Sequence, residues 1–256
     1  MNNRDTIRKA ALTCLFACFS LFIFSQEKAA KMWEYELRAG LNIGGSTPIP
    51  LPAEIRKINS YRAELNPVLA LRATHWFEKN TKWGITSGLV VDYKGMKESA
   101  EVKYWYTYLD VGEGEAKGSF SGTFSGENET KVKNGYFSIP LMATYRPFKT
   151  WKFHGGGYFS WMHTSGFKGT ASNGYIRSGG PTGERIEIKN ATFDFSEKLR
   201  SVDAGLILGA DWRFRNRMAA TGELTWGLVP VFPSDFKGIC YNMYNIYFAL
   251  GLAYRL

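Results

Sequence analysis

Histidine is the side chain best suited to general-base chemistry at neutral pH, and the chain has three of them. His75 and His154 are expected near strand ends on the side away from the long loops. His163 lies two residues before Ser165, so their side chains would share one face of a strand, but no acidic partner is identifiable. We therefore expect no catalytic site and no enzymatic activity.

Metal and cofactor sites have equally little support in the residue spacing. Three scattered histidines and Cys240, the one cysteine beyond the N-terminal segment, do not match any zinc-ligand pattern. Gly155, Gly156 and Gly157 fall inside an expected strand, where they favour close packing over a phosphate-binding loop. The sequence predicts no metal ion and no cofactor.

Charged residues instead recur at alternate positions, which is the spacing of strands. In residues 33–43 every second position is apolar, and the positions between them are polar, charged or glycine. The apolar set is Trp33, Tyr35, Leu37, Ala39, Leu41 and Ile43. Glycines and opposed charges on one face suit a narrow interior, whereas aromatics at the ends of the other face suit a lipid boundary.

The alternation recurs in eight segments, each long enough for the ~9–11 residues of a tilted membrane strand. The segments are 33–43, 68–77, 83–93, 137–146, 151–161, 202–214, 220–228 and 245–256. Connections near residues 80, 148 and 216 are short, whereas 45–66, 94–135, 163–200 and 229–241 are long. Short periplasmic turns and long external loops are typical of outer-membrane barrels.

The predicted fold is therefore all-β: an eight-stranded antiparallel transmembrane up-and-down β-barrel with both chain ends on the periplasmic side. Strand-like alternation inside the loops predicts hairpins that extend the barrel beyond the membrane, and a ten-stranded barrel is the alternative. Aromatics gather at the strand ends, as expected at membrane interfaces. The turn-side set is Trp33, Tyr35, Phe77, Trp83, Tyr145, Trp151, Trp212, Phe214 and Tyr254, and the loop-side set is Phe159, Trp161 and Trp226.

The N-terminus is interpreted as an export signal. Arg4, Arg8 and Lys9 precede an apolar run that is too short for a comfortable membrane anchor, so we expect residues 1–25 to be a cleaved signal peptide and 26–256 to be the barrel domain. A lipoprotein acceptor at Cys18 is the alternative, and the apolar run that continues past it argues against this.

The inward face predicts a network of charges. Its members are Glu34, Glu36, Arg38, Arg72, Asp92, Asp203, Asp211, Arg213, Glu223 and Arg255. An eight-stranded barrel is just wide enough to be filled by side chains, so these charges are expected to pair and plug the lumen. A narrow proton or ion path is the alternative.

The long loops carry a set of aromatic residues that could contact a partner. They are Tyr104, Trp105, Tyr106, Tyr108, Phe120 and Phe124, followed in a later loop by Phe193 and Phe195. The alternative is that these rings pack within their own hairpins.

Three stretches together resemble the PorT-like outer-membrane β-barrel family. The residues that carry the resemblance are Gly88, Leu89, Tyr93, Lys94 and Gly95; Tyr136, Ile139, Pro140, Leu141 and Tyr145; and Asp203, Gly205, Leu206 and Gly209. Ser138 departs from the acidic residue often found there, and Leu256 from the usual terminal Phe. The resemblance covers most of residues 32–256 outside the loops, and it implies an eight-stranded barrel in a Gram-negative outer membrane. The family's namesake is an accessory of a protein-secretion machine, but the resemblance implies no common activity.

We expect a structural or interaction role in the cell envelope. An accessory subunit of a secretion or transport complex is the second hypothesis, and a soluble lipocalin-like carrier is the third. The chain has a net charge of +9, but export makes anionic lipid and lipopolysaccharide the expected counter-ions rather than nucleic acid. The expected partners are therefore outer-membrane lipid, lipopolysaccharide and an envelope protein.

Overall fold

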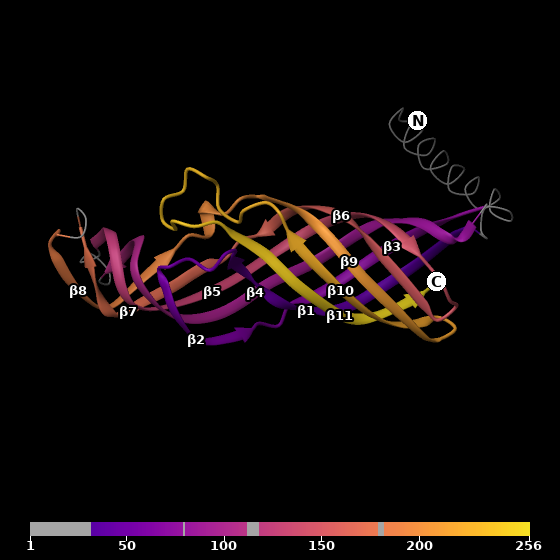
Figure 1. Cartoon of the computed structure of the whole chain (residues 1–256), viewed down its shortest axis with the longest axis horizontal. Helices are drawn as coiled ribbons and strands as arrows, with labels where there is room; N and C mark the ends of the chain where they lie inside the picture. Colours follow the sequence, from indigo (N-terminus) through magenta and orange to yellow (C-terminus); the bar gives the residue numbers. More distant parts are fainter. Residues whose placement is uncertain (1–31, 79, 112–117, 179–181) are drawn as a thin grey trace, which may run out of the picture.

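The computed structural model describes residues 32–78, 80–111, 118–178 and 182–256, and within these ranges the chain is almost entirely β-strand (Figure 1). The expected signal peptide, residues 1–25, lies outside the described residues. The strands are β1 (Trp33–Pro48), β2 (Ile55–Ala63), β3 (Pro67–Phe77), β4 (Asn80–Val111), β5 (Gly118–Tyr145), β6 (Trp151–Thr164), β7 (Phe167–Arg177), β8 (Arg185–Asp194), β9 (Val202–Arg215), β10 (Met218–Gly227) and β11 (Met243–Arg255). No helix in this part of the chain is both long and apolar enough to cross a membrane.

Eight of the described strands close into an antiparallel ring in the order β4-β3-β1-β11-β10-β9-β6-β5. The pairing β4–β5 completes the ring, and β1 meets β11 in the register Glu36↔Arg255. The predicted eight-stranded barrel is therefore confirmed, and the ten-stranded alternative is wrong, because the additional strands lie outside the ring. The short turns gather at one end of the barrel together with the C-terminus (Figure 1).

The outer face of the ring is apolar, as the alternation predicts. Leu89, Leu141 and Leu208 expose 64, 64 and 66% of their surface, which is the expected environment for a lipid boundary. The turn-side aromatics are also exposed, and several pair across or along strands, as in Trp83 with Tyr145 at 4.5 Å. A soluble lipocalin-like carrier would need the reverse arrangement, with an apolar lumen and a polar exterior.

Beyond the ring, β4 and β5 continue without interruption and build an extension with β2, β7 and β8. β5 pairs with β7, β7 with β8, and β8 returns to β4 through Asp110↔Thr192, so four strands enclose a core of their own. The core includes Met96, Val102, Trp105, Leu109, Phe124, Val132, Phe167, Ile176, Ile188, Phe193, Phe195 and Phe232. The hairpins expected in 94–135 and 163–200 are thus present, and β2 is a strand that the sequence interpretation left in a loop.

Two bulges on either side of β5 shape the extension. The register of β4 shifts between Val102 and Trp105, and Tyr104 there takes a left-handed backbone conformation with φ of 57°. The facing strand β7 shifts beside Asn173, whose φ is 49°. On β4 the buried positions change from even numbers, up to Val102, to odd numbers from Trp105 onward. Because one residue is inserted at the bulge, even-numbered side chains point inward before it and odd-numbered side chains point inward after it.

Candidate functional site

The lumen near the turns is filled by a layer of ion pairs. Lys152 lies 3.2 Å from Glu34 and also contacts Glu36 and Asp211. Arg38 reaches Asp211 with both terminal nitrogens, at 2.6 and 3.1 Å, and Glu36 at 2.8 Å. All five side chains are buried, so each charge depends on these partners for the stabilisation that water would otherwise provide.

Between this layer and the loop end of the lumen, Arg72 donates two parallel hydrogen bonds to Glu223, of 2.7 and 2.8 Å. His154 Nε2 lies 2.8 Å from the same carboxylate. Bidentate arginine–carboxylate pairs are among the strongest and most directional polar contacts in proteins. The pair therefore ties β3 to β10 across the interior of the barrel.

At the loop end of the lumen, Lys94 sits between two tyrosine rings. Its Nζ lies 4.8 Å from the ring centre of Tyr136, 4.9 Å from that of Tyr158, and 3.2 Å from Asp203. Asp92 lies near the same ammonium group, at 4.0 Å. Lys94 is only 2% exposed, so this cation is fixed in place by an anion and two π faces.

Only a small cavity separates these layers. Its volume of about 30 Å³ is lined by both groups, including Arg72, Glu223, Asp92, Lys94 and Tyr158. A space of this size holds about one water molecule. At this level the described side chains therefore nearly fill the lumen.

The predicted lumen residues all lie on the inner face, but at different depths. Glu34, Glu36, Arg38, Arg72, Asp92, Asp203 and Asp211 are buried. Glu223 is nearly so, whereas the side chains of Arg213 and Arg255 are 20 and 42% exposed at the turn-side rim, each facing Glu34. Arg213 and Arg255 are thus the outermost members of the network.

Lys94, Lys152 and His154 are members of the network that the sequence interpretation missed. Lys152 and His154 alternate with Trp151 and Phe153, so the period of two already placed them on the inner face. Lys94 was assigned to a loop because the barrel was expected to end near Tyr93. The long continuous course of β4 brings it into the lumen instead.

The predicted aromatic loop surface divides into two groups. Trp105 and Phe124 are 2 and 0% exposed and belong to the core of the extension, so they cannot contact a partner directly. Phe120 packs against that core. Tyr104, Tyr106 and Tyr108 remain exposed at 50, 38 and 40%. The bulge at Tyr104 produces this division, because it turns the odd-numbered positions inward.

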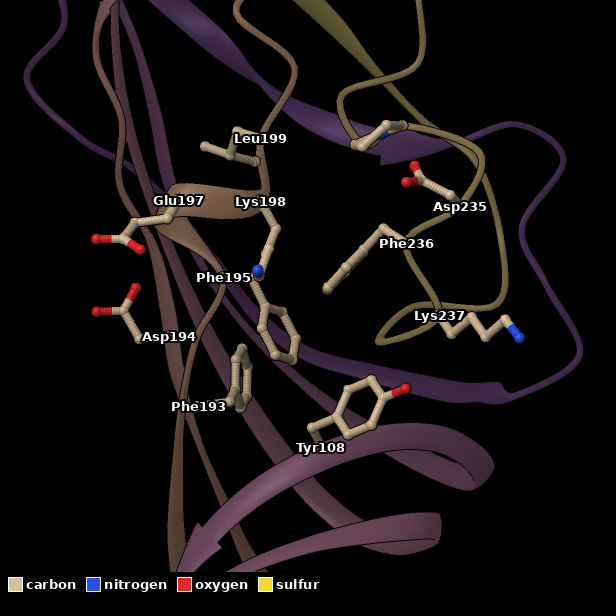
Figure 2. Close-up of a pocket in the computed structure, with 11 residues that line it drawn as sticks. Tyr108, Phe193, Asp194, Phe195, Glu197, Lys198, Leu199, Asp235, Phe236 and Lys237 are labelled. Atoms are coloured by element: carbon tan, nitrogen blue, oxygen red, sulfur yellow. The ribbon is translucent and has the colours of Figure 1, made fainter.

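A cavity of about 630 Å³ opens between β8, the short 3-10 helix Ser196–Lys198 and the loop that joins β10 to β11 (Figure 2). Its lining includes the rings of Tyr108, Phe193, Phe195 and Phe236. The charged residues around it are Asp194, Glu197, Lys198, Asp235 and Lys237.

The residues weighed earlier for catalysis lie apart. His163 packs on Phe137 at 4.5 Å and Tyr93 at 5.6 Å, and its Nδ1 lies 2.9 Å from Thr164 Oγ1. Cys240 is a free, exposed thiol in the loop that joins β10 to β11. Among the described residues, no group of three His, Cys, Asp or Glu side chains is placed to hold a metal ion.

Comparison with known proteins decides the family. The profile of the outer membrane protein beta-barrel domain matches residues 24–233, which is most of the chain. The chain belongs to the outer membrane protein beta-barrel domain family. Its location is accordingly the outer membrane, where the apolar outer face of the ring meets lipid. No curated protein matches this barrel in sequence.

Solved structures similar to this outer-membrane barrel include three bacterial proteins. Ail from Yersinia pestis, determined with the heparin analogue sucrose octasulfate, has a TM-score of 0.34 at 10% identity over 88% of this chain and 97% of Ail. OprG from Pseudomonas aeruginosa has a TM-score of 0.37 at 11% identity over 88 and 96%. The outer membrane protease OmpT from Escherichia coli has 0.33 at 11% identity over 88 and 94%.

Proposed function

We propose that this outer-membrane barrel is a closed, non-enzymatic scaffold that presents its external extension to a protein partner in the cell envelope. The observation that carries the proposal is the contrast between its two halves. The lumen is closed by buried ion pairs, whereas β4 and β5, of 32 and 28 residues, support an external sheet with its own apolar core. A rigid scaffold that displays loops is a common arrangement for binding.

Cys240 provides a direct test, because it is an exposed thiol on the external side and the one cysteine in residues 26–256. A photoactivatable cross-linker attached to Cys240 in native outer membranes should capture one protein reproducibly and in near-stoichiometric yield. The matched control moves the cross-linker to the turn between β5 and β6 with the double variant C240S/F148C, since Phe148 is 67% exposed there.

The two positions give distinguishable results. Capture from Cys240 but not from the Phe148 position supports an external partner. A barrel that yields no cross-linked protein from Cys240, and that purifies alone in mild detergent, contradicts the interaction role. A loss of lipid or peptide processing on His163→Ala would contradict the non-enzymatic part of the proposal.

A second candidate is an accessory subunit of an outer-membrane secretion or transport complex. It is supported by the resemblance to the PorT-like family. The stretch of this chain that resembles the family's Tyr-x-x-Ile-Pro-Leu strand begins at Tyr136 and lies in β5. The identity of the protein captured at Cys240 separates the candidates: a component of an export machine supports the second. We also propose lipopolysaccharide as a partner, because the chain has a net positive charge and lipopolysaccharide is anionic.

A further inference from the structure

The cavity at the external end is walled by a continuous aromatic cluster. Phe193 and Phe195 are almost fully buried and stack with ring centres 5.0 Å apart. Phe195 meets Phe236 edge-on at 5.1 Å, and Phe236 stacks on Phe232 at 4.8 Å. Phe193 and Phe195 therefore form the packed floor of the cavity, whereas Phe236 and Tyr108, which are less buried, keep ring surface that an entering ring can contact.

Few polar groups point toward these rings. In Figure 2 the Lys198 side chain runs toward the aromatic rings and the Asp235 carboxylate is turned to the cavity, whereas Asp194 and Glu197 point away. Asp194 is also already paired, at 2.8 Å, with Lys168. The cavity thus combines an aromatic wall with Lys198 and Asp235 turned toward it, and Lys237 adds a second cation to its lining.

This combination selects among ligand classes. A sugar would need partners for several hydroxyl groups at once, whereas Lys198 and Asp235 are the side chains that Figure 2 shows turned toward the cavity, and unpaired burial of hydroxyl groups is costly. An aromatic residue within a peptide places a ring in the apolar part and leaves a carbonyl oxygen and an N–H beside it. Lys198 can donate to the first, and Asp235 can accept from the second.

The size of the cavity agrees with that class. Ligand pockets commonly have volumes of about 300–1,000 Å³ and are mostly apolar with a few placed polar groups, and this one measures about 630 Å³. Aromatic side chains seated in such pockets often dominate the affinity of protein interfaces. Tyr108, exposed at the edge of the cavity, supplies a further ring.

We propose that the cavity formed by Tyr108, Phe193, Phe195, Lys198 and Phe236 binds an aromatic side chain presented by a peptide segment of a partner protein. The inference rests on the proposed interaction role and specifies what the partner must present. Lys198 and Asp235 then orient the peptide backbone on either side of the bound ring.

The test uses the full-length protein in lipid nanodiscs and three probes. They are the blocked tripeptides Ac-Gly-Phe-Gly-NH₂ and Ac-Gly-Leu-Gly-NH₂ and free L-phenylalanine, titrated by saturation-transfer NMR. The phenylalanine tripeptide should bind saturably, and the leucine tripeptide about tenfold more weakly, because it loses both ring area and aromatic contacts. Free phenylalanine should also bind more weakly, because it lacks the flanking peptide groups.

The chain offers a matched pair of variants. Tyr104 and Tyr108 are both exposed on β4, but of the two only Tyr108 lines the cavity. Tyr108→Ala should weaken binding of the phenylalanine tripeptide several-fold, whereas Tyr104→Ala should leave it unchanged. Phe236→Ala should weaken it about tenfold. Because Tyr108 is exposed on a strand, its replacement tests the site even if Phe236→Ala disturbs the loop.

Several results would overturn the inference: equal affinity for the two tripeptides, free phenylalanine binding as tightly as the peptide, no saturable binding, or equal losses in the two tyrosine variants. These results are independent of the cross-linking experiment. A partner captured from Cys240 by a protein that binds none of the probes would overturn the aromatic site and leave the interaction role intact.

Discussion

The pair of Arg72 with Glu223 is a bidentate contact inside the lumen, and it gives a clear prediction for one residue. Arg72→Leu leaves a buried carboxylate without its main partner, and we expect the free energy of unfolding to fall by about 3–5 kcal/mol. Urea titration in detergent micelles, followed by tryptophan fluorescence, measures the change. Arg217→Leu, at the exposed turn after β9, is the matched control and should unfold like the parent protein.

The double variant Arg72→Leu/Glu223→Leu separates pairing from charge removal. It buries two apolar side chains in place of two ions, so most of the loss should be regained. A single variant as stable as the parent would show that the pair contributes nothing to holding β3 and β10 together.

The same lumen shows why a neutral residue suits position 138. Ser138 Oγ donates to Asp92 Oδ1 at 3.1 Å and lies 2.6 Å from Ser160 Oγ. Asp92, on the neighbouring strand, already supplies the carboxylate at this level. A second carboxylate beside it would leave two like charges close together in a buried site.

At the scale of the element, the bulge in β4 makes a distinct prediction. Tyr104 occupies a left-handed conformation that costs β-branched residues more than others, because their branched side chain crowds the backbone there. Tyr104→Val should therefore destabilise the extension by about 1–3 kcal/mol, with Tyr106→Val as the matched control in regular strand. Hydrogen exchange of β4 and β5 amides reports the change.

Amides of the membrane ring serve as the internal reference in that experiment. They should keep their protection in both variants, since the bulge lies in the extension. Equal exchange in Tyr104→Val and Tyr106→Val would mean that the bulge carries no strain and adapts freely to its side chain.

The attachment of β2 should depend on pH through Glu98, which lies opposite Tyr61 in the extension. Burial raises the pKa of Glu98 above its ordinary value. A carboxyl group whose pKa is higher in the folded state stabilises that state at low pH and loses the contribution as pH rises through the folded pKa. Protection of β2 amides, corrected for intrinsic exchange, should thus increase as pH falls from neutral toward the pKa. Glu98→Gln should remove this dependence, and a retained dependence would exclude Glu98 as its source.

The period of two predicted each membrane strand because every such strand has lipid on one side and the lumen on the other. It could not predict the bulge at Tyr104, since an inserted residue is recognised only when its pairing partners on β5 are known. β2 was missed for a related reason. Its residues are exposed on both faces, so no alternation marks it.

For the molecule as a whole, the ion-paired lumen predicts an absence of conduction. Planar-bilayer recordings of the purified barrel should show no discrete channel openings, because buried ion pairs cross the lumen and the two cavities beside Arg72 and Glu223, of about 30 Å³ each, hold roughly one water molecule. Lys94→Ala removes the cation that fills the loop-side layer and is the variant most able to open a leak. Reproducible nanosiemens-scale steps in the parent protein would contradict the closed lumen.

The unbroken course of β4 has a mechanical consequence. At about 3.3 Å per residue its 32 residues span roughly 100 Å, of which a bilayer needs only about a third. A pull on the far end of the extension, directed along the strands, would move β4 and β5 together and load in shear the hydrogen bonds that join β4 to β3 and β5 to β6, so that many share the force at once. The extension is therefore held in the membrane by strands that belong to both the barrel and the extension. Tension applied outside the cell reaches the barrel through these strands rather than through a flexible linker.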